Sequence, residues 1–243
     1  MKRFLFILGI TVGSLILIAI LVLGYFGFMP GVSAVFGSDK PVDLGVTYTE
    51  QDRQAGRVKA GWEVKALSAD LPPEESLRYS GQNQIDTTFS EKELNAWINK
   101  EWKYFPISDC QIRINDDSTV EFSGKLHTNR LEDFAQAFGF SEAYSTITDY
   151  LDEWYIIGNP VIYIKFSGGV TNGAIVNAKV LKLKVGRLSI PNSIIDDNTE
   201  QFVKFASWQA GRIPGFSVEE LEFINGTMKF VGTLPAIIER SPQ

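Results

Sequence analysis

The stretch VLKLKVGRLSIP, from Val180 to Pro191, has the composition of a β-strand, but its apolar residues do not stay on one side. They occupy even positions from Ala174 to Val180, odd positions from Leu181 to Val185, and even positions again after Gly186. Side chains of a strand alternate with period two, so each change of parity requires a bulge, a bend or an exchange of the covered face. The pattern predicts a twisted, bulged strand with its second irregularity at Gly186.

The length of this strand limits the shape of the fold. A single strand from Ala174 to Ile190 would cover about 17 residues and reach roughly 56 Å, against a usual length of 5–6 residues. A small spherical domain cannot bury such a strand, so we expect a long sheet that curls around helices and encloses an elongated apolar volume. Two interpretations stay open: helix side chains fill this volume, or it forms a groove for an acyl chain.

The chain from Ser90 onward falls into three similar blocks, each with helix signals followed by two strands around a turn. Capping residues precede the helices, and turn residues separate runs of alternating apolar residues. Because every pair is antiparallel, with helices packed on the sheet, the predicted fold class is α+β. The predicted helices begin at Ser90, at Leu131, at Ser141 and after Asp196–Asp197, and the predicted turns are 115–118, 167–173 and Asn225–Gly226.

The N-terminal segment predicts a membrane anchor. No charge occurs from Phe4 to Met29, and Lys2 and Arg3 precede this run. As a helix it would exceed the ~30 Å thickness of the hydrocarbon core, with the basic pair in the cytoplasm and the rest of the chain extracytoplasmic. A cleaved signal peptide is the alternative, since VSA at Val32–Ala34 offers a peptidase site. The run is longer than the typical h-region of about 7–15 residues, which favours the uncleaved anchor.

The expected domain organisation follows from these segments. Residues 1–30 would form the cytoplasmic stub and single-pass anchor, 31–43 a juxtamembrane linker, and 44–243 one α+β domain, in which 44–79 is open to interpretation as an added N-terminal element. A capping box of Thr49 with Asp52 predicts a helix that runs to about residue 60.

Composition and motifs argue against several functions. The net charge of −6 disfavours a nucleic-acid partner. His127, the only histidine, shares a strand face with Ser123, but four residues along a strand separate them by about 13 Å, and no Gly-x-Ser-x-Gly motif occurs. Cys110, the only cysteine, alternates with apolar residues and is expected to be buried and unreactive. We expect no metal, no cofactor and no enzymatic activity; an envelope hydrolase is the least favoured hypothesis.

Three stretches of the chain carry related motifs: FSEKELNAWINK (Phe89–Lys100), NGAIVNAKVLKLKVGRLSIP (Asn172–Pro191) and GRIPGFSVEELEF (Gly211–Phe223). Together they resemble the YpmS-type membrane-anchored proteins of Gram-positive bacteria. Those proteins share an N-terminal span, a helix similar to LNALI and a strand that ends in Gly-x-Leu-x-x-Pro, matched here by Gly186, Leu188 and Pro191. The resemblance implies no catalytic residues, and a shape similar to tubular lipid-binding folds; residues 44–79 depart from the family pattern.

Together these features favour a binding module of the cell envelope that holds or passes a lipid or a lipid-linked precursor in an apolar groove. The alternative is an interaction protein with a solid core that docks an envelope enzyme through a sheet edge or through residues 44–79. The predicted groove residues are Leu94, Trp97, Ile112, Phe122, Phe134, Phe138, Leu181, Leu183 and Val185, and the predicted headgroup residues are Lys182, Lys184 and Arg187.

Overall fold

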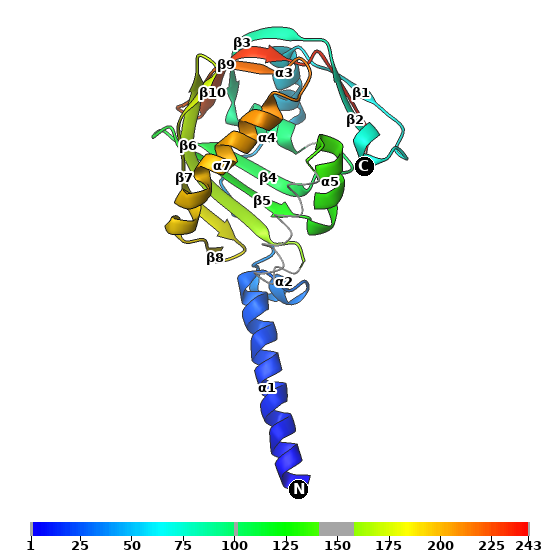
Figure 1. Cartoon of the computed structure of the whole chain (residues 1–243), viewed down its shortest axis with the longest axis vertical. Helices are drawn as coiled ribbons and strands as arrows, with labels where there is room; N and C mark the ends of the chain where they lie inside the picture. Colours follow the sequence, from blue (N-terminus) through cyan, green and yellow to red (C-terminus); the bar gives the residue numbers. More distant parts are fainter. Residues whose placement is uncertain (1, 100–101, 141–157, 243) are drawn as a thin grey trace.

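A computed structural model describes residues 2–99, 102–140 and 158–242 of the chain, without the side chains of residues 2–11 and 202. Helix α1 (Lys2–Phe26) projects as a stem from a domain built on a curled sheet (Figure 1). The α+β class and the curled antiparallel sheet are therefore confirmed. The helix predicted to begin at Ser141 lies outside the described residues.

The main sheet has eight strands. The order β3-β10-β9-β6-β5-β4 forms the path of the sheet, β7 pairs with β6, and β8 pairs with β7, all antiparallel. The strands are β3 (Asn83–Ser90), β4 (Ile107–Ile114), β5 (Val120–Leu126), β6 (Val161–Thr171), β7 (Ala174–Val185), β8 (Leu188–Ser189), β9 (Ser217–Ile224) and β10 (Thr227–Leu234).

A second, three-stranded sheet was not predicted. It places β11 (Ile237–Arg240) between β1 (Glu63–Ala66), which runs parallel to it, and β2 (Leu77–Ser80), which runs antiparallel. The end of the described chain is thus joined to residues 63–80, and a short 3-10 helix, η1 (Pro73–Glu75), connects β1 with β2.

Helices pack on and around the main sheet. Helix α3 contacts α4, α4 contacts β4, and α7 contacts β7. In Figure 1, α7 crosses the concave side of the sheet near β6 and β7. The helices are α2 (Val32–Phe36), α3 (Glu50–Ala60), α4 (Glu91–Ile98), α5 (Leu131–Phe138) and α7 (Asn192–Ala210).

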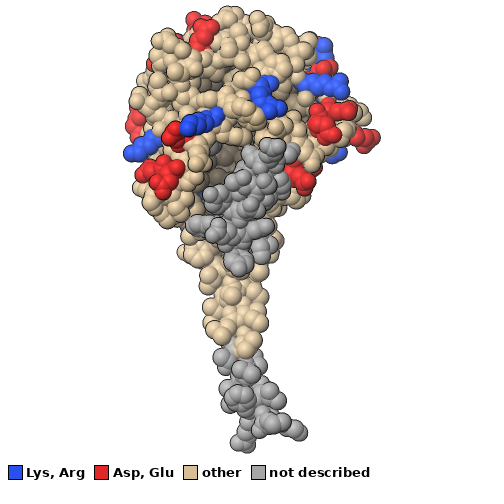
Figure 2. Space-filling view, in the orientation of Figure 1, with Lys and Arg blue, Asp and Glu red and all other residues tan. Residues whose placement is uncertain are grey.

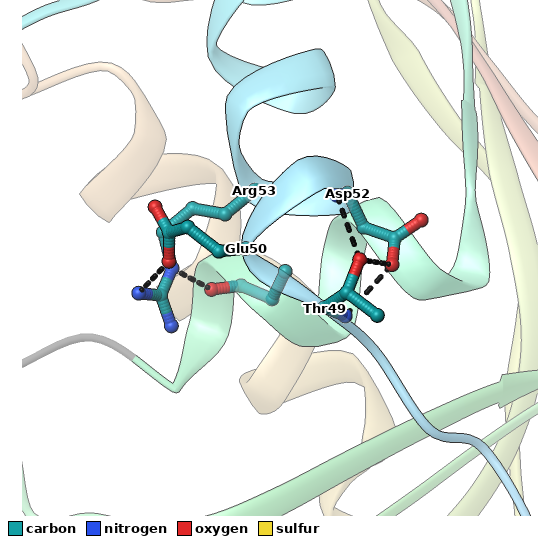
Figure 3. Close-up of polar contacts among 5 residues, drawn as sticks. Thr49, Glu50, Asp52 and Arg53 are labelled. Atoms are coloured by element: carbon teal, nitrogen blue, oxygen red, sulfur yellow. Dashed lines mark hydrogen bonds and ion pairs between the residues drawn. The ribbon is translucent and has the colours of Figure 1, made fainter.

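The predicted capping box of α3 is confirmed (Figure 3). The Asp52 amide donates to Thr49 Oγ1 at 3.3 Å, and the Thr49 amide donates to Asp52 Oδ2 at 2.7 Å. Arg53 ties this helix to α4, because its Nε donates to the Ala96 carbonyl at 3.1 Å. The capping box of Ser90 with Glu93 at the start of α4 is confirmed as well.

The single ribbon predicted from Ala174 to Ile190 is wrong at its C-terminal end. Strand β7 ends at Val185, the chain turns at Gly186, and β8 folds back so that Val185 pairs with Leu188. Gly186 has a φ of 59°, and a Cβ there would collide with the Phe26 carbonyl oxygen. The glycine therefore allows a tight reversal against α1 where a bend within one strand was expected.

The parity change at Leu181 is confirmed as a β-bulge. Lys182 pairs with Lys165 and Val180 pairs with Phe166, which leaves Leu181 as the extra residue. A second register shift follows between Ser167 and Gly169, opposite β7 residues 176–179, and the sequence pattern did not reveal it. These bulges bend the β6–β7 pair.

Two predicted boundaries are wrong. Strand β6 continues to Thr171, so the turn predicted at 167–173 is reduced to Asn172 and Gly173. Helix α7 begins at Asn192, because the amides of Ile194 and Ile195 already bond to the Pro191 carbonyl. Asp196–Asp197 therefore lie within the helix and do not precede it.

The stem is attached closely to the domain. Ser38 Oγ donates to the Gly24 carbonyl at 2.6 Å, and the Val42 amide donates to Ser123 Oγ at 2.8 Å, so residues 31–43 are held by polar contacts to α1 and β5. Of the helices in the described part of the chain, none is both long and apolar enough to cross a membrane. The predicted membrane span is thus not confirmed.

Candidate functional site

A large cavity lies on the concave side of the main sheet. Its volume is about 1130 Å³, and its walls come from the main sheet, the three-stranded sheet, α4, α5 and α7. Figure 2 shows the domain hollowed on this face. Most of the described lining residues are aliphatic or aromatic, including Ile112, Phe122, Phe166, Val180, Ile195 and Phe223.

Strand register explains how β6 and β7 supply one wall. Ile164 pairs with Leu183 and Phe166 pairs with Val180, and all four side chains line the cavity. Val180 and Leu183 differ by an odd number of residues, so a regular strand would place them on opposite faces. The bulge at Leu181 returns both to the concave face.

The structure brings most of the predicted groove residues together. Leu181 and Val185 do not line the cavity: Leu181 is the bulged residue, 36% exposed, and Val185 lies beside the turn at Gly186. The predicted residues that line it are Leu94, Trp97, Ile112, Phe122, Phe134, Phe138 and Leu183.

The three predicted headgroup cations do not line the cavity. Lys182 and Lys184 alternate with Leu183 and pair with Lys165 and Tyr163, so they lie on the convex face of the sheet. Arg187 reaches the stem, where its Nη2 donates to the Phe36 carbonyl at 2.6 Å. These cations are thus separated from the cavity by the sheet itself.

Sequence reasoning missed the three-stranded sheet as a wall of the cavity. Leu77, Tyr79, Ile238 and Arg240 line this part. Burial raises the pKa of Tyr79 to about 12, so its hydroxyl is protonated at neutral pH. No local sequence pattern pointed to these residues, because β11 and β2 are far apart in the chain and come together only in the folded structure.

Aromatic rings close the side of the cavity between α5 and α7. The ring centroids of Phe134 and Phe138 are 4.8 Å apart, and Phe138 contacts Trp102 edge to face at 5.7 Å. Phe140, just after α5, contacts Phe205 of α7 edge to face at 5.4 Å. This cluster joins the two helices over the sheet.

The charged residues in the described part of the lining are all basic. None of its described residues is Asp or Glu, and the basic residues among them are Lys179 and Arg240. Lys179 is exposed, whereas its neighbours Ala178 and Val180 are half-buried, so its ammonium group is accessible to solvent although the residue lines part of the cavity. Arg240 shares a strand face with Ile238 and is directed toward the cavity.

The histidine has a serine partner, but not the one considered from the sequence. His127 Nε2 lies 2.9 Å from Ser108 Oγ, whereas Ser123 accepts a hydrogen bond from Val42. Burial, with Arg130 and Lys125 nearby, lowers the pKa of His127. Asp109 accepts from Ser108 Oγ at 3.1 Å, so this carboxylate contacts the serine, whereas a hydrolytic triad requires a carboxylate on the histidine.

Cys110 is 2% exposed, as expected from its alternation with apolar residues. Burial, with the nearby Asp109 charge, raises the pKa of its thiol to about 12, so it is not a thiolate nucleophile at neutral pH. In the described part of the chain, no group of three or more His, Cys, Asp or Glu side chains is placed to hold a metal ion.

No family model, no curated protein and no solved structure matches this chain. The resemblance to YpmS-type proteins stays a prediction.

Proposed function

We propose that this protein is a non-catalytic lipid-binding or lipid-transfer module that holds acyl chains in the cavity. The observation that carries the proposal is a cavity of about 1130 Å³ with an almost wholly apolar lining. Ligand pockets in proteins commonly measure about 300–1,000 Å³, so this volume is large enough for a substantial ligand. The extended shape of the sheet suits a long chain better than a compact molecule.

Energetics favour an apolar occupant. Water is held in buried sites by about three polar partners, which this lining seldom offers. An acyl chain would instead contribute about 0.8 kcal/mol for each buried CH₂.

We propose in addition that α1 attaches the protein to the cell membrane, with the domain on the extracytoplasmic side. The support is the exposure of apolar side chains around the described part of α1, among them Leu15, Ile16 and Leu17 at 55–61%. A run of exposed apolar side chains needs a partner that covers it, and a bilayer does so. Lys2 and Arg3 would remain in the cytoplasm.

The proposal extends to a Gram-positive cell envelope through the resemblance to YpmS-type proteins. A lipid or lipid-linked envelope precursor is the corresponding ligand class. The second hypothesis is an interaction protein that docks an envelope enzyme. On this hypothesis the function does not depend on the cavity, so an experiment that blocks the cavity distinguishes it from lipid binding.

The test is native mass spectrometry of the full chain released from membranes in mild detergent. We expect co-purified lipid, and uptake of a fluorescent fatty acid after delipidation. Ala206→Trp places an indole in the cavity from α7 and should abolish uptake. Val58→Trp, at an exposed position on α3, is the matched control and should leave uptake unchanged.

Two results would contradict the proposal. One is a ligand-free mass together with no uptake by the unaltered chain. The other is a protein partner, recovered by crosslinking in cells, whose binding and function survive Ala206→Trp; this result would favour the docking hypothesis.

A further inference from the structure

The three-stranded sheet presents one face to the cavity. Tyr79 of β2 is opposite Ile238 of β11, and Leu77 is opposite Arg240. All four line the cavity, whereas Arg78 and Ser80, which alternate with the β2 pair, are exposed. Tyr79 and Arg240 are therefore diagonal neighbours on the cavity face, at a separation of about 7–8 Å that long side chains can bridge.

Backbone contacts fix the position of Arg240 although it lies near the end of the chain. Its carbonyl accepts from the Leu67 amide at 2.8 Å, and the next amide, of Ser241, donates to the Ser76 carbonyl at 2.8 Å. Ser76 also accepts a hydrogen bond from Trp102 Nε1 at 3.3 Å. The segment that carries Arg240 is thus joined to two other parts of the chain.

Tyr79 supplies a second polar group at this end. Burial disfavours its phenolate, so the hydroxyl remains a neutral donor through the physiological pH range. A guanidinium and a phenolic hydroxyl together can donate several hydrogen bonds to one anionic group, and arginine matches carboxylate and phosphate oxygens in a bidentate manner.

The remainder of the cavity has the opposite character. Its walls along β6 and β7 are formed by apolar residues such as Ile164, Val180 and Leu183, and the described lining contains no carboxylate. A ligand that fits both regions has a long apolar part and one anionic end.

We propose that Arg240 and Tyr79 form the headgroup site of the cavity, and that the ligand is an acyl chain with a single carboxylate or phosphate end group seated between them. This inference rests on the proposed lipid-binding function. It fixes the direction of the ligand, with its headgroup at the three-stranded sheet and its tail toward β7 and α7. It also assigns the headgroup role to residues other than the lysines of β7.

The test compares three ligands with the same twelve-carbon chain: laurate, dodecyl phosphate and dodecanol. Each displaces the neutral dye Nile red from the delipidated full chain held in amphipol. We expect the better of the two anions to bind about tenfold or more tightly than dodecanol, because hydrogen bonds to charged groups are the strong ones. The order of laurate and dodecyl phosphate distinguishes a fatty acid from a phosphorylated lipid as the ligand.

Substitutions test which residues cause the preference for an anionic ligand. Arg240→Gln should reduce binding of the preferred anion about tenfold and leave dodecanol within about threefold, and Tyr79→Phe should reduce anion binding a few-fold. Arg240→Lys should retain part of the preference, which would separate loss of charge from loss of structure. Arg78→Gln changes a cation on the opposite face of β2 and should have no effect.

The outcomes separate the two proposals. If all three ligands bind equally, or if Arg240→Gln keeps the anion preference while its melting temperature is unchanged, the headgroup site is wrong and lipid binding stands. If no ligand displaces the dye from the unaltered chain, the lipid-binding function itself is wrong.

Discussion

The backbone amide of Arg187 donates a hydrogen bond to the carbonyl of Phe26 at 2.9 Å, which fixes the end of α1 to the turn between β7 and β8. The Arg187 guanidinium also lies 4.6 Å from the centre of the Tyr25 ring. The segments on both sides of this turn contribute to the cavity wall, since Leu183 and Ile190 both line it, and the Ile190 amide donates to the Leu183 carbonyl at 2.9 Å. One hairpin therefore connects the stem to the cavity.

Gly186→Val should loosen this connection. The new side chain would collide with the Phe26 carbonyl oxygen, and a β-branched residue at a φ of 59° adds backbone strain of about 1–3 kcal/mol. We expect a lower melting temperature and faster proteolysis between residues 27 and 43. Gly226→Val is the control, because a valine at its φ of 75° has a comparable conformational cost but its Cβ would meet open space. Equal protease resistance of the two variants would contradict the contact.

Large-to-small substitutions should distinguish the packed core from the cavity wall. Phe230 is 3% exposed within the core cluster that includes Phe89 and Leu94, so Phe230→Ala should cost about 3–5 kcal/mol. Phe122 already borders the cavity, so Phe122→Ala opens less new void and should cost about 1–3 kcal/mol. The measurement is the free energy of unfolding in urea. Equal losses would indicate that the wall at Phe122 is packed like the core.

Glu121 should contribute to the pH dependence of stability. Burial pushes its pKa upward, but hydrogen bonds from Tyr163 Oη at 2.7 Å and Asn115 Nδ2 at 3.0 Å, with Lys165 nearby, lower it below 4.5 overall. A lowered pKa in the folded state stabilises the fold above the unfolded pKa, and this contribution is lost as pH falls through the folded value. Stability should therefore decrease below about pH 4.5, and less steeply in Glu121→Gln. Identical slopes in a pH series of melting temperatures would exclude this contribution.

Cys110 should be protected from alkylation in the folded protein. Its burial and its pKa of about 12 leave almost no accessible thiolate at pH 8. Iodoacetamide should label it only after unfolding, as measured by intact mass. Rapid labelling of the folded chain, at the rate of a free thiol, would show that β4 opens.

Local physics made several elements predictable from the sequence alone. Ser90 with Glu93 starts α4, Gly139 ends α5 in the left-handed conformation, and Asn225–Gly226 turns the last hairpin of the main sheet. The parity change at Leu181 marked the bulge that keeps the β6–β7 wall apolar. Each of these signals involves residues within a few positions of one another, because helix capping, turn formation and the alternation of side chains along a strand are local effects.

Other features were decided only by contacts between distant segments. The pairing of Glu63–Ala66 and Leu77–Ser80 with Ile237–Arg240 carries no local pattern, yet it places Arg240 at the cavity. The turn requires a glycine at position 186 because the Phe26 carbonyl, from near the start of the chain, packs against it. The sequence by itself determined the class of fold, the helix caps and most of one apolar wall. The volume of the cavity and the residues at its polar end depend on how distant strands meet, because neighbouring residues do not encode long-range pairing.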